Sequence, residues 1–229
     1  MPALIESISQ TRARQPRRTT LPVAPNPLIG REEERRAIIA ALTDPACRLL
    51  TLVGPGGTGK TRLALDAASS LAGHFADGVV WVPLASVAAA DSVAVAIAGA
   101  LQHPLHGAEP PVAQVLDLLH DRDLLLALDN MEHVLEAADI LAMLLEHAPR
   151  VRLLVTSRER LRLAGEWVIE VPGLALPDAG GSPEGTHAAA IRLFEVRARQ
   201  VMHQFAVAEA NQADVTRICR LLEGMPLGI

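Results

Sequence analysis

The amino-acid sequence predicts an α/β fold, in which helices cover both faces of a parallel β-sheet. Along most of the 229 residues, apolar runs of strand length alternate with stretches of helical composition. This alternation is the pattern typical of parallel sheets. Two of the runs, residues 124–129 and 151–156, are almost continuously apolar, as central strands buried on both faces should be.

A glycine-rich segment follows the first expected strand, residues 47–53, and precedes an expected helix over residues 62–68. The segment consists of Gly54, Pro55, Gly56, Gly57, Thr58, Gly59, Lys60 and Thr61. It fits the phosphate-binding pattern G-x-x-x-x-G-K-[ST] at every fixed position. Glycines let the backbone turn its N–H groups inward, and the first helical turn adds unpaired donors. We therefore expect Lys60 to reach the β- and γ-phosphates of a nucleotide and the Thr61 hydroxyl to ligate Mg²⁺.

The other elements up to residue 120 follow from local signals. Residues 1–27 hold five prolines and one acidic residue, which predicts an extended, solvated linker or a tail. A helix is expected to begin near Arg31, because acidic residues fill its first turn, and to end at Asp44, which precedes a proline. Further expected elements are a strand at 78–84 and helices at 88–101 and 111–120.

The apolar run at 124–129 ends in Asp129. Open α/β sheets bind their ligands at the carboxyl ends of the strands, so Asp129 is the expected carboxylate on the Mg²⁺ side of a nucleotide. The alternative is that Asp129 caps the helix expected over residues 131–147. Two further strands are expected at 151–156, closing on Ser157 and Arg158, and at 167–171.

The C-terminal part predicts a second, smaller unit. A loop rich in Gly, Pro and Ser is expected at 177–186, followed by helices at 187–203 and 211–223. The expected division is a linker or tail at 1–27, a nucleotide-binding domain at 28–180 and a partial helical domain at 181–229, inside which the chain ends.

Composition argues against several functions. The net charge is −5, Tyr is absent and aromatic residues are scarce, so neither a basic face nor a stacking platform for nucleic acid is expected. No apolar run approaches the length of a membrane span. Cys47 and Cys219 lack metal-ligand spacing, which favours free thiols in a reducing, cytoplasmic compartment.

Five motifs in a fixed order suggest a family. They are Leu28-Ile29-Gly30-Arg31-Glu32, the phosphate loop, Leu128-Asp129-Asn130-Met131-Glu132-His133, Thr156-Ser157-Arg158 and Gly224-Met225-Pro226-Leu227. Over residues 28–229 the chain resembles the STAND class of P-loop ATPases, close to the NB-ARC domain, and especially the ATPases of bacterial LuxR-type and antibiotic-pathway regulators. The phosphate loop alone is generic, whereas the order together with the terminal Gly-x-Pro is much more specific.

The resemblance implies a P-loop NTPase sheet of five parallel strands in the order 2-3-4-1-5. That order sets the strand of Arg158 between the strands that carry Lys60 and Asp129. Arg158 is similar to the sensor arginine that reads the γ-phosphate, and a permanently charged fork suits that role. The implied catalytic set is therefore Lys60, Asp129 and Arg158, with ATP or ADP and Mg²⁺ as ligands.

The resemblance also implies contacts on the adenine side of the nucleotide. Gly30 and Arg31 are expected near the base, and Pro226 is expected to pack against it. Arg62, directly after the loop, completes the expected binding set. Family members continue into winged-helix and repeat regions, which implies output and sensor domains beyond this chain and oligomerisation in the ATP state.

The residue after Asp129 is Asn130, where many P-loop ATPases carry a second acid. Asn cannot take a proton from water, although it can orient one, so we expect a switch with slow hydrolysis. Glu132 is a candidate substitute for the acid.

Three alternatives stay open. An AAA+ ATPase of the origin-recognition type would need an arginine finger and basic elements, and Gly224-x-Pro226 argues against it. A small-molecule kinase would need an arginine-rich lid, and the loops at 102–110 and 177–186 contain no arginine. A scaffold that holds nucleotide without turnover is compatible with Asn130.

Overall fold

A computed structural model describes residues 19–23, 26–177 and 188–229. Its centre is a parallel sheet of five strands in the order β2-β3-β4-β1-β5, which confirms the expected α/β fold and strand order. The strands are β1 (Leu49–Val53), β2 (Val79–Pro83), β3 (Leu125–Asp129), β4 (Arg152–Ser157) and β5 (Glu166–Glu170). The expectations for residues 1–18 and for the loop beyond residue 177 lie outside the described residues.

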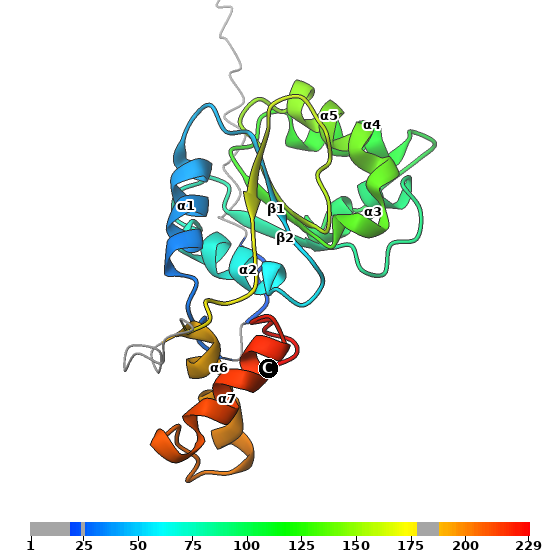
Figure 1. Cartoon of the computed structure of the whole chain (residues 1–229). Helices are drawn as coiled ribbons and strands as arrows, with labels where there is room; N and C mark the ends of the chain where they lie inside the picture. The colour runs from blue at the N-terminus through cyan, green and yellow to red at the C-terminus, as the bar shows by residue number, and fades with distance from the viewer. Residues whose placement is uncertain (1–18, 24–25, 178–187) are drawn as a thin grey trace, which may run out of the picture.

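Helices form a layer on each face of the sheet (Figure 1). On one face lie α1 (Glu32–Thr43) and α2 (Lys60–Ser70), and on the other α3 (Ser92–Ala100), α4 (Pro111–Leu119) and α5 (Ala138–His147). Alternate strand residues enter opposite apolar clusters: Val80 and Val82 pack with α3, α4 and α5, whereas Trp81 packs with α1 and α2. Burial on both faces explains why the strands are continuously apolar in sequence.

The helix expected over 131–147 is only partly helical. Residues 131–137 form two 3₁₀ turns, η1 (Met131–His133) and η2 (Leu135–Ala137), and α5 begins at Ala138. The physical cause is the backbone of Asn130, whose φ of 66° is left-handed and turns the chain as it leaves β3. The chain therefore winds around the carboxyl end of β3 before α5 starts.

The expected linker also contains an ordered contact. The N–H of Thr20 donates to the carbonyl oxygen of Val79 at 3.0 Å, and the N–H of Trp81 donates to that of Thr20 at 3.2 Å. Thr20 thus forms a parallel bridge with Val80 at the edge of the sheet. Residue 20 is therefore paired with the sheet rather than simply solvated, and the division of the chain into a linker and two domains stays a prediction.

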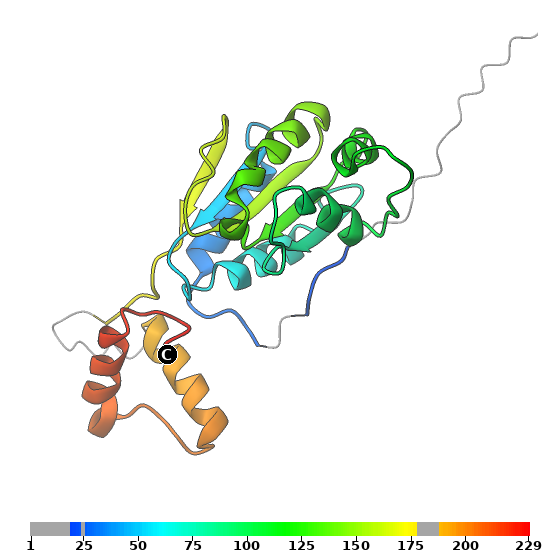
Figure 2. The same ribbon diagram turned by 90° about the vertical axis from the view of Figure 1, so that its right-hand side faces the viewer.

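A pair of helices, α6 (Ala189–Val201) and α7 (Glu209–Leu221), lies beyond the carboxyl ends of the strands and has its own apolar cluster (Figures 1 and 2). The turn after α7 packs on the phosphate loop, where the N–H of Leu227 donates to the carbonyl of Gly57 at 3.2 Å. Gly57 has a φ of +87°, and a Cβ there would lie 2.9 Å from the Cβ of Leu227. A glycine is therefore required both by the backbone and by the approach of the C-terminal turn.

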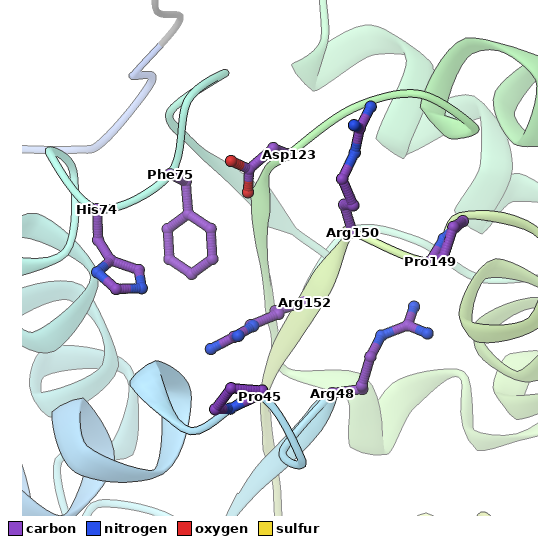
Figure 3. A pocket seen from close by; sticks show the side chains of 8 residues that line it. All are labelled: Pro45, Arg48, His74, Phe75, Asp123, Pro149, Arg150 and Arg152. Atoms are coloured by element: carbon purple, nitrogen blue, oxygen red, sulfur yellow. The ribbon is translucent and has the colours of Figure 1, made fainter.

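A cavity of about 340 Å³ lies at the amino ends of the central strands, away from the phosphate loop (Figure 3). Its lining residues are Pro45, Arg48, His74, Phe75, Asp123, Pro149, Arg150 and Arg152. The Arg48 guanidinium donates to the carbonyls of Leu145, Ala148 and Val151, and that of Arg152 donates to the carbonyl of Leu42. These arginines satisfy carbonyls at and beyond the C-terminal ends of α5 and α1, so their charges have a structural use.

Cys47 and Cys219 are both free and buried, in agreement with the expectation of free thiols. Burial raises the pKa of Cys47 to about 11, which keeps that thiol protonated and unreactive. No helix within residues 19–23, 26–177 and 188–229 has both the length and the apolar character needed to cross a bilayer.

Arg31 joins three parts of the fold. Its side chain is 4% exposed. One guanidinium nitrogen donates to the carbonyl of Thr58 in the phosphate loop, at 3.1 Å, and to that of Pro172 after β5. The other nitrogen pairs with the carboxylate of Glu34 in α1 at 2.6 Å. Arg31 therefore fixes the phosphate loop relative to the exit from β5.

Replacing Arg31 by Met should lower the free energy of unfolding by about 2–4 kcal/mol, because the buried carbonyl of Thr58 and the partly buried carbonyl of Pro172 lose a charged donor and Glu34 loses its partner. Urea unfolding followed by circular dichroism measures this loss. Arg36→Met is the matched control, since Arg36 is exposed and its side chain bonds the carbonyl of Glu32 in its own helix, and it should cost less than about 0.5 kcal/mol. Equal losses in the two variants would contradict the assigned role.

Candidate functional site

The phosphate loop curls around the side chain of Lys60. The Lys60 ammonium, on a residue that is 7% exposed, donates to the carbonyl of Gly54 at 2.7 Å and to that of Pro55 at 3.0 Å. The Thr58 hydroxyl donates to the Pro55 carbonyl at 3.1 Å. A phosphate that enters the loop would replace these carbonyls as the acceptor of the lysine N–H groups. The replacement is favourable because it pairs the ammonium with an anion.

Asp129 lies at the end of β3 and accepts two hydroxyl hydrogen bonds on one oxygen. Thr61, in the first turn of α2, donates to Oδ1 at 2.8 Å, and Thr156, in β4, donates to the same oxygen at 2.6 Å. The Thr156 oxygen in turn accepts the N–H of Asn130 at 2.9 Å. The sequence singled out Thr61 and Asp129 for their chemistry but not Thr156. The expected strand order would have found it, because it makes β4 the neighbour of β3.

Thr61 and Asp129 have the chemistry that Mg²⁺ requires. A hydroxyl and a carboxylate are hard oxygen ligands, and here they lie within hydrogen-bond distance of each other. Among the described residues no three His, Cys, Asp or Glu side chains gather into a metal cluster. Mg²⁺ usually takes one or two protein ligands and completes its shell with phosphate oxygens and water, and the pair of Thr61 and Asp129 supplies two such ligands. The residues present fit the ion.

Arg158 follows the last residue of β4 and reaches the phosphate loop. A Cβ placed on Gly56 would lie 3.7 Å from a terminal nitrogen of the Arg158 guanidinium. The Arg158 side chain is 63% exposed, and its Nε lies 3.3 Å from Oε1 of Glu132. This position beside the loop suits a contact with a terminal phosphate, and the contact itself stays a prediction.

Charges around the loop act on one another. Burial lowers the pKa of Lys60, the carboxylates of Glu132 and Asp129 oppose that lowering, and the charge of Arg158 adds to it. Strands and turns that are distant in sequence thus bring two cations and two carboxylates into one electrostatic site. Glu132 belongs to this site because of the turn after β3.

The residues expected on the adenine side lie where the sheet domain meets the α6–α7 pair. A Cβ on Gly30 would collide with that of Ala189 in α6, and a Cβ on Gly59 would lie 3.8 Å from the ring of Pro226. Arg31 contacts backbone carbonyls rather than open space, and Arg62 lies in the first turn of α2. Their contacts with a base stay predictions.

The AAA domain family matches residues 44–163 of this chain, which include the phosphate loop, Asp129 and Arg158. An uncharacterized protein of Mycobacterium tuberculosis is 37% identical over 202 residues, which cover 88% of this chain and 48% of the relative. Another protein of that species, provisionally named an HTH-type transcriptional regulator, is 38% identical over 183 residues, 80% of this chain and 19% of the relative. The regulatory protein AfsR of Streptomyces griseus is 31% identical over 137 residues, 56% of this chain and 14% of AfsR. The chain thus spans about half of the first relative and much less of the others.

Three archaeal proteins of known structure share the fold. Cdc6p of Pyrobaculum aerophilum superposes with a TM-score of 0.55 at 16% identity, over 90% of this chain and 61% of that one. The ORC2 protein of Aeropyrum pernix, solved as ADPNP–ADP complexes, has a TM-score of 0.52 at 16% identity, over 85% and 68%. A STAND protein of Pyrococcus horikoshii with a tetratricopeptide repeat sensor has a TM-score of 0.50 at 15% identity, over 89% and 29%. The chain therefore belongs to the AAA domain family, and its fold and its regulator-like relatives agree with a STAND-class P-loop ATPase.

Proposed function

We propose that this chain is the nucleotide-binding module of a signalling or transcriptional regulator, and that it switches between ADP-bound and ATP-bound states. The observation that carries the proposal is the meeting of Lys60, the Thr61–Asp129 pair and Arg158 at one edge of the sheet. The names of the longer relatives support the regulatory setting. The output and sensor domains would belong to parts of a longer protein.

In this proposal the chain binds the phosphates through the loop N–H groups, the first turn of α2 and Lys60. Thr61 and Asp129 hold Mg²⁺, which when bound neutralises charge on the phosphate oxygens. Thr156 keeps the Asp129 carboxylate oriented through its 2.6 Å hydrogen bond. The nucleoside would lie on the side of the loop that faces Gly30, Arg31, Arg62 and Pro226.

The switch follows from the contact between the loop and the α6–α7 pair. Leu227 and Pro226 lie against the loop glycines, so a phosphate that alters the loop also alters the seat of the helical pair. ADP would favour the closed arrangement and ATP an open one that assembles with other copies. The same contacts would transmit the state of the nucleotide to the output domains.

Substitution of Lys60 tests nucleotide binding. Lys60→Ala removes a buried positive charge that would lie beside the phosphates. The affinity for ATP, measured by calorimetric titration with Mg²⁺, should fall more than tenfold, about 1.4 kcal/mol or more. Lys60 is the only lysine in the sequence, so a second readout is direct: ATP should protect it from amine-directed labelling detected by mass spectrometry. Undiminished ATP affinity in the variant would refute the assignment.

Turnover should be slow, well below the roughly 1–100 s⁻¹ of kinases. The reason is that the side chain of Asn130 cannot accept a proton from water. The backbone N–H of Asn130 is already bonded to the hydroxyl of Thr156. Steady-state release of phosphate from ATP measures the rate. Release at kinase-like rates would sink this expectation, and no release at all would favour the scaffold that only holds nucleotide.

Arg158 should distinguish ATP from ADP. Arg158→Ala should weaken the binding of ATP by about 1.5–3 kcal/mol, the range for a hydrogen bond to a charged group. The binding of ADP should be nearly unchanged, because the loop already binds the β-phosphate. Parallel titrations with the two nucleotides make the comparison. Arg160, which is also exposed and pairs at the surface with Glu170, provides the matched control in Arg160→Ala. Equal losses for ATP and ADP would leave Arg158 a general electrostatic role.

A further inference from the structure

The two partners of the ion pair between Glu132 and Arg158 differ strongly in burial. Glu132 lies in the turn after β3, and its side chain is 12% exposed, whereas that of Arg158 is 63% exposed. Oε1 of Glu132 lies 3.3 Å from Nε of Arg158. The other oxygen, Oε2, is buried and has no hydrogen-bond partner among the residues that the structure describes. A mostly buried carboxylate, which also feels the charge of Lys60, is thus hydrogen-bonded to an exposed arginine.

This pair is poorly satisfied on both sides. In the described part of the chain the two side chains are joined by one hydrogen bond, through Nε at 3.3 Å, and not by the two-point fork that arginine forms with carboxylates and phosphates. An unpaired buried oxygen carries a desolvation cost, and an ion pair with an exposed partner contributes little. An anion that offers the guanidinium a fork can therefore displace Glu132.

Glu132 cannot follow the arginine if Arg158 moves. The residues on either side of its turn, Met131 and Val134, are buried in the apolar cluster under α3, α4 and α5. The backbone N–H of Val134 also closes the turn on the carbonyl of Met131 at 2.9 Å. The backbone that carries Glu132 is therefore anchored, so a shift of Arg158 toward a terminal phosphate lengthens the pair rather than carrying the turn along.

We propose that Glu132 occupies Arg158 as an internal stand-in for the γ-phosphate, and that ATP but not ADP exchanges with it. The inference rests on the proposed nucleotide switch and deepens it by naming the residue that sets the selectivity between ATP and ADP. With ADP bound, Arg158 stays on Glu132. With ATP bound, Arg158 forks onto the terminal phosphate, so the affinity for ATP is reduced by the cost of breaking the pair.

The variant Glu132→Gln tests this exchange, with an opposite sign from the loss of an ordinary binding residue. ATP should bind about three- to tenfold more tightly, because Arg158 is no longer held, while the affinity for ADP changes less than about twofold. Glu136→Gln is the matched control: it removes the same charge four residues later from an exposed side chain and should change neither affinity. Glu132→Asp, which keeps the charge but shortens the side chain, should raise the affinity for ATP by less than Glu132→Gln does.

A double variant separates exchange from simple repulsion between Glu132 and phosphate. In the Arg158→Ala background, Glu132→Gln should lose most of its effect on ATP. An equal tightening in that background, an equal effect of Glu136→Gln, or unchanged ATP affinity in both Glu132 variants would each overturn the proposal. Wild-type protein that binds neither nucleotide would instead refute the proposed function, because the selectivity is measured only on a site that binds ADP.

Discussion

One oxygen of Asp129 holds the nucleotide edge of the sheet together. Oδ1 accepts hydroxyl hydrogen bonds from α2 through Thr61 and from β4 through Thr156, so three elements meet at a single atom. Thr156 then accepts the N–H of Asn130, which starts the turn after β3. Glu132 and Arg158 each follow this network within three residues, and their separation is set by it. A carboxylate at this point is therefore structural as well as chemical.

Local patterns in the sequence were sufficient for the strands and for the phosphate loop. Burial on both faces makes each central strand apolar throughout, and the loop chemistry requires glycines and a lysine at fixed spacing. The prediction of a helix over 131–147 was partly wrong, because tertiary contacts determine the conformation of its first turns. Residues 131–137 have a helical composition, yet the left-handed backbone of Asn130 and its bond to Thr156 direct the chain around β3 instead. No local signal contains that constraint.

Long side chains limited what could be predicted for the site. Arg31 belongs to a motif that suggests nucleotide contact, but its guanidinium donates to carbonyls 27 and 141 residues away. Thr20 likewise pairs with β2 far along the chain. Spacing in the sequence identifies chemistry that is concentrated in one segment. It does not identify a partner that folding brings from elsewhere. The exception is a case such as Arg158, where the family resemblance implied the strand order and hence the position of the residue.

The contacts of Arg31 also lie where the chain passes from the sheet domain to the α6–α7 pair. Val171 packs in the cluster under α1 and α2, whereas Leu174 packs in the cluster of the α6–α7 pair and bonds the carbonyl of Gly224 through its N–H at 2.7 Å. The chain therefore passes from one rigid cluster to the other within Pro172 and Gly173. Arg31 grips the Pro172 carbonyl and the Thr58 carbonyl of the phosphate loop with the same nitrogen. Within the proposed switch, a nucleotide that shifts the phosphate loop would act on Thr58 and, through the two N–H groups of this nitrogen, on Pro172. Coupling between linked sites is typically about 1–3 kcal/mol.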